Sequence, residues 1–369
     1  MEKFKLFFKK TDKSLLLFAL ILSLVGLVLI YSATLSKASN KFMLIQGATI
    51  LLGVFIYILL TFIDISNLSH LWKYIFVLNC IFLASVFFFG VGGEETGNNS
   101  WLRFFGIGIQ PAEVGKLLFI LTLCRHVADM DCQVNKFKNL LQLLIHCAIP
   151  MGIIIVTSGD VGVSLPYLFI LLIVLIAAGL KLRWLAIIGA LGGVMAPILW
   201  FFGFSANQRD RILVVLDPSL DPLGKGYHAI QSKIAIGSGQ LFGRGFMLGS
   251  QTQNSFLPAK WTDFIFSVAG EEFGMIGVML LLILSAAIIL RCFLHSAKIT
   301  NSFFSLVCTA VGAMFAFQVI INIGMCIGLT PVIGITLPFV SYGGSSMLTS
   351  FACLGLVSSA KFHRSPSSL

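Results

Sequence analysis

The stretch Phe256-Leu-Pro-Ala-Lys-Trp-Thr-Asp-Phe-Ile-Phe-Ser-Val-Ala-Gly-Glu-Glu-Phe-Gly-Met-Ile-Gly277 marks the passage from a polar loop into an apolar helix. It holds three of the chain's 15 acidic residues. Asp263 stands where the loop ends, and Glu271 and Glu272 follow about 12 Å into the helix at 1.5 Å per residue. Carboxylates inside membrane helices are costly and usually functional. The stretch therefore predicts chemistry close to a membrane boundary.

The composition excludes a soluble globular protein, because 57% of the residues are hydrophobic and only 11% are charged. Apolar runs of about 20 residues recur along the chain, each long enough to cross the hydrocarbon core of a bilayer. We predict an all-α polytopic membrane protein that forms one domain over residues 1–369, with about ten transmembrane helices near 14–34, 42–62, 71–91, 111–128, 141–158, 161–180, 184–203, 264–290, 303–329 and 346–360.

Lys and Arg residues predict the orientation of these helices. If the N-terminus is cytoplasmic, the short outer loops hold only Lys37, Lys41 and Arg103 of the basic residues. We therefore expect both termini on the cytoplasmic side of the cytoplasmic (inner) membrane. This bias, with attraction to anionic membrane lipid, explains the net charge of +10 without a nucleic acid partner.

Two outer segments interrupt the hydrophobic pattern, at 92–111 and at about 204–263. A structureless loop as long as the second is uncommon in a compact protein. Because it contains apolar clusters at 212–216 and 230–236, we predict one large extracytoplasmic loop with short interfacial helices.

Asp263 has two compatible interpretations. Aspartate is a preferred helix N-cap, and Thr-Asp before an apolar run is an ordinary helix start. The same carboxylate could accept a proton from a sugar hydroxyl, or bind a divalent cation on a diphosphate. The two glutamates that follow favour a role beyond capping.

Trp101 and Arg103 lie in the first outer segment. One interpretation is an interfacial aromatic belt at headgroup depth. The other is a binding loop in which Trp101 stacks on a sugar and Arg103 holds phosphate through its planar guanidinium.

A charge cluster is expected near the outer ends of two helices. Glu113 and Lys116 are three residues apart and share a helix face, and Asp160 opens a later helix from the same side. We predict that the three meet, either to hold helices together or to line a substrate groove.

Two further elements are candidate binding surfaces. Arg209 and Arg211, in the long loop, could hold phosphates or contact lipid headgroups. The segment Leu329–Ser346 places prolines and polar residues, including Ser341 and Tyr342, at membrane depth, where broken backbone must be buried or line a cavity. We predict a re-entrant element beside an outward-facing groove.

In this order, these blocks resemble the SEDS family (shape, elongation, division and sporulation). The resemblance covers nearly the whole chain and is carried by several motifs: Trp101-x-Arg103, Gln110-Pro-x-Glu-x-x-Lys116, Asp217-Pro218, Gly226-Tyr-His228, Gln231-Ser232, Phe256-Leu-Pro258, Thr262-Asp-Phe-Ile-Phe266, Glu271-Glu272 and Leu337-Pro-Phe-x-Ser-Tyr-Gly-Gly-Ser-Ser346. Within the family, Gly-Tyr-His followed by Ala235-Ile-Gly-Ser-Gly239 is more similar to RodA than to FtsW.

The resemblance implies a peptidoglycan glycosyltransferase that polymerises lipid II, releases undecaprenyl diphosphate and works with a class B penicillin-binding protein. It implies that Asp263 is the essential aspartate, as general base or as ligand of Mg²⁺ or Mn²⁺, with no organic cofactor. Arg103, Arg209 or Arg211 would stabilise the diphosphate, and Glu271 and Glu272 would hold the helix behind Asp263. A lipid II flippase, a division role and a non-catalytic scaffold are the alternatives.

One departure from the family pattern concerns the loop before Asp263. The family usually has Leu-Pro-Glu and then a histidine, whereas this chain has Ala259 and Trp261 at those positions. If the missing acid binds metal in the family, this chain binds metal differently.

Overall fold

The computed structural model describes residues 11–35, 41–92, 99–104, 107–221 and 224–363. Several basic residues that support the predicted orientation, at positions 3–10 and 37, lie outside these ranges.

Each of the ten predicted membrane spans falls on a helix, which confirms a multi-pass helical membrane protein. The helices are α2 (Lys13–Thr34), α3 (Lys41–Phe62), α5 (Trp72–Ala84) with α6 (Val86–Phe89), α8 (Pro111–Asp129), α9 (Phe137–Ser158), α10 (Val161–Ala177), α11 (Leu182–Ile198), α15 (Ile265–Lys298), α16 (Ser302–Ile327) and α17 (Gly344–Phe362).

The spans differ in length and in apolar character. Within the described ranges, six have the length and apolar character of a full crossing, and α10 and α11 are shorter apolar helices. α8 is less apolar because it carries charged residues, and α17 because it is rich in serine. A membrane helix with polar residues is stable when protein surrounds it, and most of α17 is buried.

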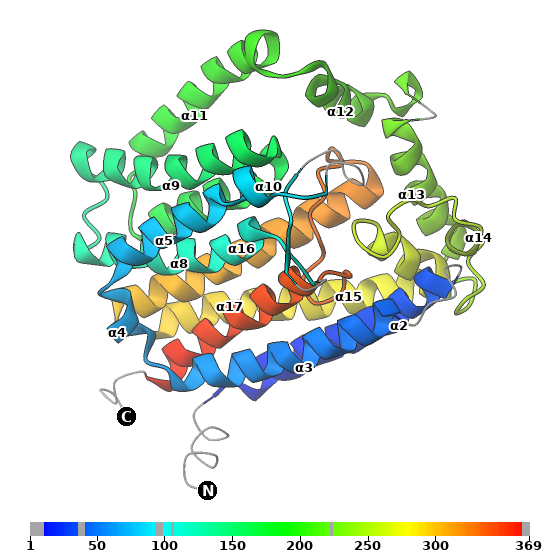
Figure 1. The fold of residues 1–369 in the computed structure, drawn as a ribbon, viewed down its shortest axis with the longest axis horizontal. Helices are drawn as coiled ribbons and strands as arrows, with labels where there is room; N and C mark the ends of the chain where they lie inside the picture. Colours follow the sequence, from blue (N-terminus) through cyan, green and yellow to red (C-terminus); the bar gives the residue numbers. More distant parts are fainter. Residues whose placement is uncertain (1–10, 36–40, 93–98, 105–106, 222–223, 364–369) are drawn as a thin grey trace, which may run out of the picture.

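The helices run side by side in one bundle, with the residues of the long loop gathered at one end (Figure 1). α16 is the most enclosed of those six long apolar spans and packs against α15, α10, α8 and α17. α3 packs on α17, and α2 packs on α15. α11 has no buried residue and stands apart at the top of the view.

The start of α2 and the ends of α15 and α17 meet at the other end of the bundle, which we call the termini end. Asp12 caps α2 by accepting a hydrogen bond from Ser14 N, and it also binds two side chains of α15. Arg291 Nη1 lies 2.8 and 2.7 Å from its two carboxylate oxygens, and His295 Nε2 lies 2.7 Å away. Burial opposes ionisation of Asp12, but the hydrogen bonds from His295 and Arg291 outweigh it and lower the pKa of the carboxyl.

Replacing Asp12 with Asn is therefore expected to lower the stability near neutral pH by about 1.5–3 kcal/mol, the range for hydrogen bonds to charged groups. Since the folded-state pKa lies below the unfolded value of about 3.9, the contribution is present above that pH and is lost as the pH falls through the folded-state pKa. Thermal unfolding of both proteins in detergent, near neutral pH and in acid, measures this. A stability difference that stays constant in acid would contradict it.

The opposite end, which we call the loop end, contains the predicted short helices of the long loop. They are α12 (Ala206–Leu216), the 3₁₀ turn η3 (Pro218–Leu220), α13 (Lys225–Gly239) and α14 (Ser250–Gln253). The segment around Trp101 was predicted to be a loop, but part of it is regular. It forms an antiparallel pair of strands, β1 (Leu102–Phe104) and β2 (Ile107–Ile109), in which Arg103 pairs with Gly108.

α15 is kinked at Gly274, inside a span that the sequence predicts to be continuous. Gly274 has φ of 64°, and a Cβ atom there would lie 2.3 Å from the backbone nitrogen of Gly243. The kink frees backbone N–H groups, so that Met275 N binds Gln240 O and Ile276 N binds Leu241 O. Glycine is needed here because the left-handed conformation and the close approach both exclude a side chain.

Candidate functional site

Asp263 lies at the loop end, just before α15. The helix begins at Ile265 with Phe264 as its N-cap, and no side chain caps it. The simple capping interpretation of Asp263 is therefore wrong. Asp263 is half-buried as a residue, and its side chain does not cap the helix.

The environment of Asp263 shifts its pKa upward. Burial raises the pKa from 3.8 to about 6, the hydrogen bond from Thr262 opposes that shift, and the negative charge of Asp160 adds to it. Such a carboxylate is ionised near neutral pH and is a stronger base than an ordinary aspartate. This is the condition that general base catalysis requires.

Asp160 lies close enough to Asp263 for its negative charge to raise the Asp263 pKa. It is the N-cap of α10, where its Oδ1 accepts a hydrogen bond from Val163 N at 3.3 Å. Gly334 also lies next to Asp263, since a Cβ atom on this glycine would be 3.8 Å from Asp263 Oδ2. The start of α10, the loop before α15 and the segment 328–343 thus converge on one carboxylate pair.

Ser341 and Tyr342 hold the Asp263 loop in place. The Ser341 hydroxyl donates to Thr262 O at 2.7 Å and accepts from Leu337 N at 2.9 Å. Tyr342 N donates to Trp261 O at 2.8 Å. Ser341 is buried, so the geometry supports positioning of the loop more directly than contact with a substrate.

The strand pair that carries Trp101 and Arg103 is attached to the same segment. Ser345 Oγ donates to Gly108 O at 3.2 Å and accepts from Gln110 N at 3.0 Å. Trp101 is partly exposed and lies over Gly108, while Arg103 is exposed on β1. Because Ser341 and Ser345 are four residues apart, the chain limits these two anchor points to roughly 14 Å.

Asn322, in α16, is a site residue that the sequence analysis missed. Its Nδ2 donates to Asp263 O at 2.9 Å and to Ile335 O at 2.7 Å. It is fully buried and joins the Asp263 loop to the segment 328–343. An amide in a largely apolar span is the signal that could have indicated it, although Gln318 in the same helix gives the same signal.

We expect Asn322→Ala to lower kcat by about 10- to 100-fold with a much smaller change in KM, because a small misplacement of the reacting group is enough for such a loss. The measurement is the kinetics of the purified variant, normalised to the folded fraction. An unchanged kcat per folded molecule, with only a lower melting temperature, would show that Asn322 is structural.

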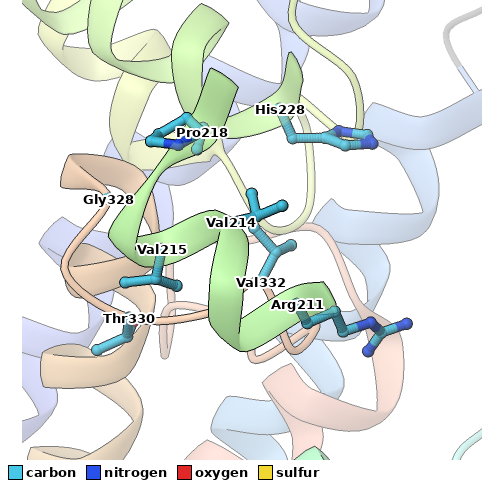
Figure 2. A pocket seen from close by; sticks show the side chains of 9 residues that line it. Arg211, Val214, Val215, Pro218, His228, Gly328, Thr330 and Val332 are labelled. Atoms are coloured by element: carbon cyan, nitrogen blue, oxygen red, sulfur yellow. The ribbon is translucent and has the colours of Figure 1, made fainter. Parts of the chain in front are cut away.

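A cavity of about 130 Å³ adjoins the Asp263 loop. Its walls come from α12, from the start of α13 and from the segment 328–332 (Figure 2). Arg211 and His228 line it together with valines, and the His228 ring stacks on Phe264 with centroids 6.1 Å apart. Burial lowers the pKa of His228, so its imidazole is neutral near neutral pH.

The structure separates the two arginines that the sequence groups together. Arg211 lines the cavity, whereas Arg209 Nε donates to Phe204 O at 3.2 Å, within its own helix start. Of the two arginines, only Arg211 is thus part of the cavity wall.

Glu113 and Lys116 form the predicted ion pair on α8, with 2.7 Å between Nζ and Oε1. Lys116 is almost fully buried, and the exposed fraction of the Glu113 side chain is 12%. Gly115, in the same turn, faces Tyr167 of α10 and Asn79 of α5. Glu113 and Lys116 thus form the predicted pair, and the charge of the third predicted member, Asp160, acts on Asp263.

Glu271 and Glu272 are buried in the first turns of α15. Glu271 accepts hydrogen bonds from Gln251 N, Thr252 N and Thr252 Oγ1 at 2.7–2.9 Å. Glu272 Oε1 accepts from Ser32 Oγ of α2 at 2.5 Å and from Gln253 Nε2 at 3.3 Å. These contacts support the predicted structural role, because they tie α14 and α2 to the helix behind Asp263.

Ala259 and Trp261 fit the loop without disturbing it. Ala259 has φ of 45°, and its carbonyl accepts from Thr262 N and Phe264 N. The Trp261 ring packs on Phe42 of α3, with centroids 5.7 Å apart. The two replacements thus give the loop a packing anchor where the family pattern has polar side chains.

The described residues contain no group of three or more His, Cys, Asp or Glu side chains that could hold a metal ion. Asp160 and Asp263 are nevertheless close enough for one charge to act on the other. Mg²⁺ is commonly bound by one or two carboxylates together with substrate phosphates and water. This donor set fits a cation that binds together with a diphosphate.

Known proteins resemble the chain over nearly its whole length. It is 35% identical to the peptidoglycan glycosyltransferase MrdB of Escherichia coli, over 96% of this chain and 94% of that protein. It is 31% identical to the probable peptidoglycan glycosyltransferase FtsW of a Geobacter species, over 94% and 95%. It is 32% identical to the stage V sporulation protein E of Bacillus subtilis, over 95% and 97%.

Solved structures have the same architecture. A chain of the structure described as "Structural coordination of polymerization and crosslinking by a peptidoglycan synthase complex" matches with a TM-score of 0.81 and 29% identity, over 96% of this chain and 98% of that one. The crystal structure of the rod shape determining protein RodA of Thermus thermophilus matches with a TM-score of 0.71 and 25% identity, over 96% and 97%. Residues 12–366 also match the family of cell cycle proteins that comprises FtsW, RodA and SpoVE. The chain therefore belongs to this family, the SEDS family that its sequence motifs indicate.

Proposed function

We propose that the chain is a peptidoglycan glycosyltransferase that polymerises lipid II into glycan strands during cell wall elongation. The names of its relatives support this activity, and the identity with MrdB supports the elongation branch over division. The observation that carries the proposal is the position of Asp263, half-buried at the loop end beside Asp160, with its carboxyl pKa raised to about 6.

The reaction joins two lipid-linked disaccharides. The 4-hydroxyl of the acceptor GlcNAc attacks the anomeric carbon of the donor MurNAc, the new C–O bond forms, and the bond from that carbon to the diphosphate breaks. Asp263 takes the hydroxyl proton, and undecaprenyl diphosphate leaves with the electron pair. Arg211 and Arg103 are candidates to stabilise the developing charge on the diphosphate.

The strand pair and the cavity are both connected to the Asp263 loop. The strand pair that carries Trp101 and Arg103 is bound by Ser345, and His228 of the cavity wall stacks on Phe264. A polymerase needs two substrate sites around its base, and these two surfaces are the proposed sites. Lipid tails would enter from the bilayer between helices.

A divalent cation, Mg²⁺ or Mn²⁺, belongs to the proposal. Asp263 and Asp160 would hold it against the diphosphate, where it would neutralise charge on the leaving group. No organic cofactor is required.

The proposed setting is the cytoplasmic membrane, with the loop end outside. A class B penicillin-binding protein is the proposed partner, and it would cross-link the strands that this chain polymerises. The similarity to a chain of a complex that coordinates polymerization and crosslinking supports a partner of that kind.

The test of the activity is polymerisation of labelled lipid II by the purified chain with its transpeptidase partner. Glycan strands that form while the transpeptidase is blocked support the proposal. Movement of lipid II between leaflets without polymer would favour the flippase, and no activity in either assay would favour the scaffold.

The rate of polymerisation is expected to fall as the pH drops through about 6, because Asp263 must be ionised either to accept a proton or to bind a cation. Below that pH the loss approaches tenfold per pH unit. Asp160→Asn should move the inflection downward, because it removes a negative charge that raises the Asp263 pKa. Thr262→Val should move the inflection upward, because it removes a hydrogen bond that lowers that pKa. Coincident profiles for all three proteins would contradict the assignment.

A further inference from the structure

A groove of about 410 Å³ lies between the start of α2 and the last turns of α15, at the termini end and far from Asp263 in the bundle. Its apolar lining consists of Phe18 from α2 and of Ala287, Leu290 and Leu294 from α15. The exposed fractions of Leu290 and Leu294 are 59% and 46%. The groove is thus open along the side of a membrane helix, where lipid tails lie.

Cationic side chains line the polar part of the same groove. Arg291, His295 and Lys298 follow one another at helical spacing of four and three residues, so they share a face with Ala287 and Leu294. Along α15 the lining begins with the apolar Ala287 and Leu290, apolar and basic residues alternate at 291–295, and Lys298 ends the helix. The lining therefore changes from apolar to basic toward the termini end, as headgroups follow tails in a bilayer.

Positive charges outnumber negative ones near the basic part of the groove. Asp12 supplies one carboxylate, and Arg291 and His295 are bound to it. Arg291, Lys298 and Lys361 are three permanent cations that act on one another across α15 and α17. Three cations against one carboxylate leave an excess of two positive charges. Cations in the last turn of a helix also stabilise it through the helix dipole. That explanation accounts neither for the groove nor for Lys361, which lies on another helix.

We propose that this groove binds an anionic glycerophospholipid. One acyl chain would lie along Phe18, Ala287, Leu290 and Leu294, and the phosphate would lie at Lys298 and the outer edge of Arg291. A free anion would use only the basic part, whereas the apolar part of the lining matches a hydrocarbon chain. Basic pockets between membrane helices bind anionic headgroups in this way. The site is separate from the proposed polymerisation chemistry.

The experiment is native mass spectrometry of the full chain in a non-ionic detergent, titrated with dioctanoyl phosphatidylglycerol or with dioctanoyl phosphatidylcholine. We expect phosphatidylglycerol to bind about tenfold more tightly, given two excess charges near the headgroup. Lys298→Glu should weaken phosphatidylglycerol binding by about fivefold or more. Ala287→Trp should weaken both lipids, because the indole fills the apolar part.

The matched control is Lys138→Glu, which reverses an exposed lysine of α9 at the same end, away from the groove. It should leave both affinities unchanged. Equal affinities for the two lipids, or equal losses in the Lys298 and Lys138 variants, would overturn the proposal. So would full displacement of the lipid by soluble glycerol phosphate, which would assign the site to a free phosphate. Loss of the bound lipid when the transpeptidase partner is present would assign the groove to that partner instead.

Discussion

Replacing Asp263 with Asn is expected to lower the rate of lipid II polymerisation by about 10²- to 10⁴-fold, the range for loss of a general base. The carboxamide has the same shape but can neither accept the proton of the attacking hydroxyl nor hold a divalent cation. Its folding should be intact, because the backbone carbonyl still binds Asn322 Nδ2 and Cys326 Sγ, and the carboxamide oxygen can still accept the hydrogen bond from Thr262. The measurement is strand synthesis from labelled lipid II by the purified protein with its partner.

The control for that experiment is Asp210→Asn, which removes an exposed carboxylate of α12 in the same loop. Its rate should match that of the unaltered chain. Full activity in the Asp263 variant would contradict both proposed roles of this residue, as general base and as ligand of a divalent cation. Equal melting temperatures of the two variants would show that any loss is chemical.

The second large effect is expected at the ion pair of α8. Lys116→Ala should lower the free energy of unfolding by about 3–5 kcal/mol, because it leaves Glu113 buried without its partner. The double variant Glu113→Gln with Lys116→Met should recover most of this loss, since it removes both charges and keeps the volume. Thermal unfolding of the single and double variants in detergent measures the difference.

The activity of that double variant decides between the two roles of the pair. If Glu113 and Lys116 only hold helices together, the double variant should polymerise lipid II at a rate close to normal. If they line a substrate groove, the variant should be stable but slow. A double variant as unstable as the single one would contradict the ion pair model, because no unpaired charge would remain to explain it.

The membrane spans could be predicted because hydrocarbon thickness leaves few choices. An apolar run near 20 residues must be helical to satisfy its own backbone, so the positions of α2, α3, α15 and α16 follow from composition. The kink at Gly274 could not be predicted, because a glycine inside an apolar run also occurs in continuous helices. The loop at 239–245, which packs into the kink, makes it necessary.

The strands around Arg103 were missed for a related reason. Each has three residues, too few for an alternating pattern to be recognised. They are held by the hydroxyl of Ser345, more than 200 positions later in the chain. Asn322 was missed because an amide in a largely apolar helix, where Gln318 also lies, gives no local indication of its partners.

By itself, the sequence determined that this is a multi-pass helical membrane protein with a large loop at one end, and it singled out Asp263 and the family motifs. Burial in a bilayer and local residue patterns are sufficient for those conclusions. Only the tertiary structure decided which side chains meet. It brought Asp160 to Asp263, bound Ser341 to the loop, paired Glu113 with Lys116 and placed Arg211 at the cavity. The physical reason is that the carboxylate's pKa and orientation depend on burial and on neighbours far apart in sequence, which helix packing alone brings together.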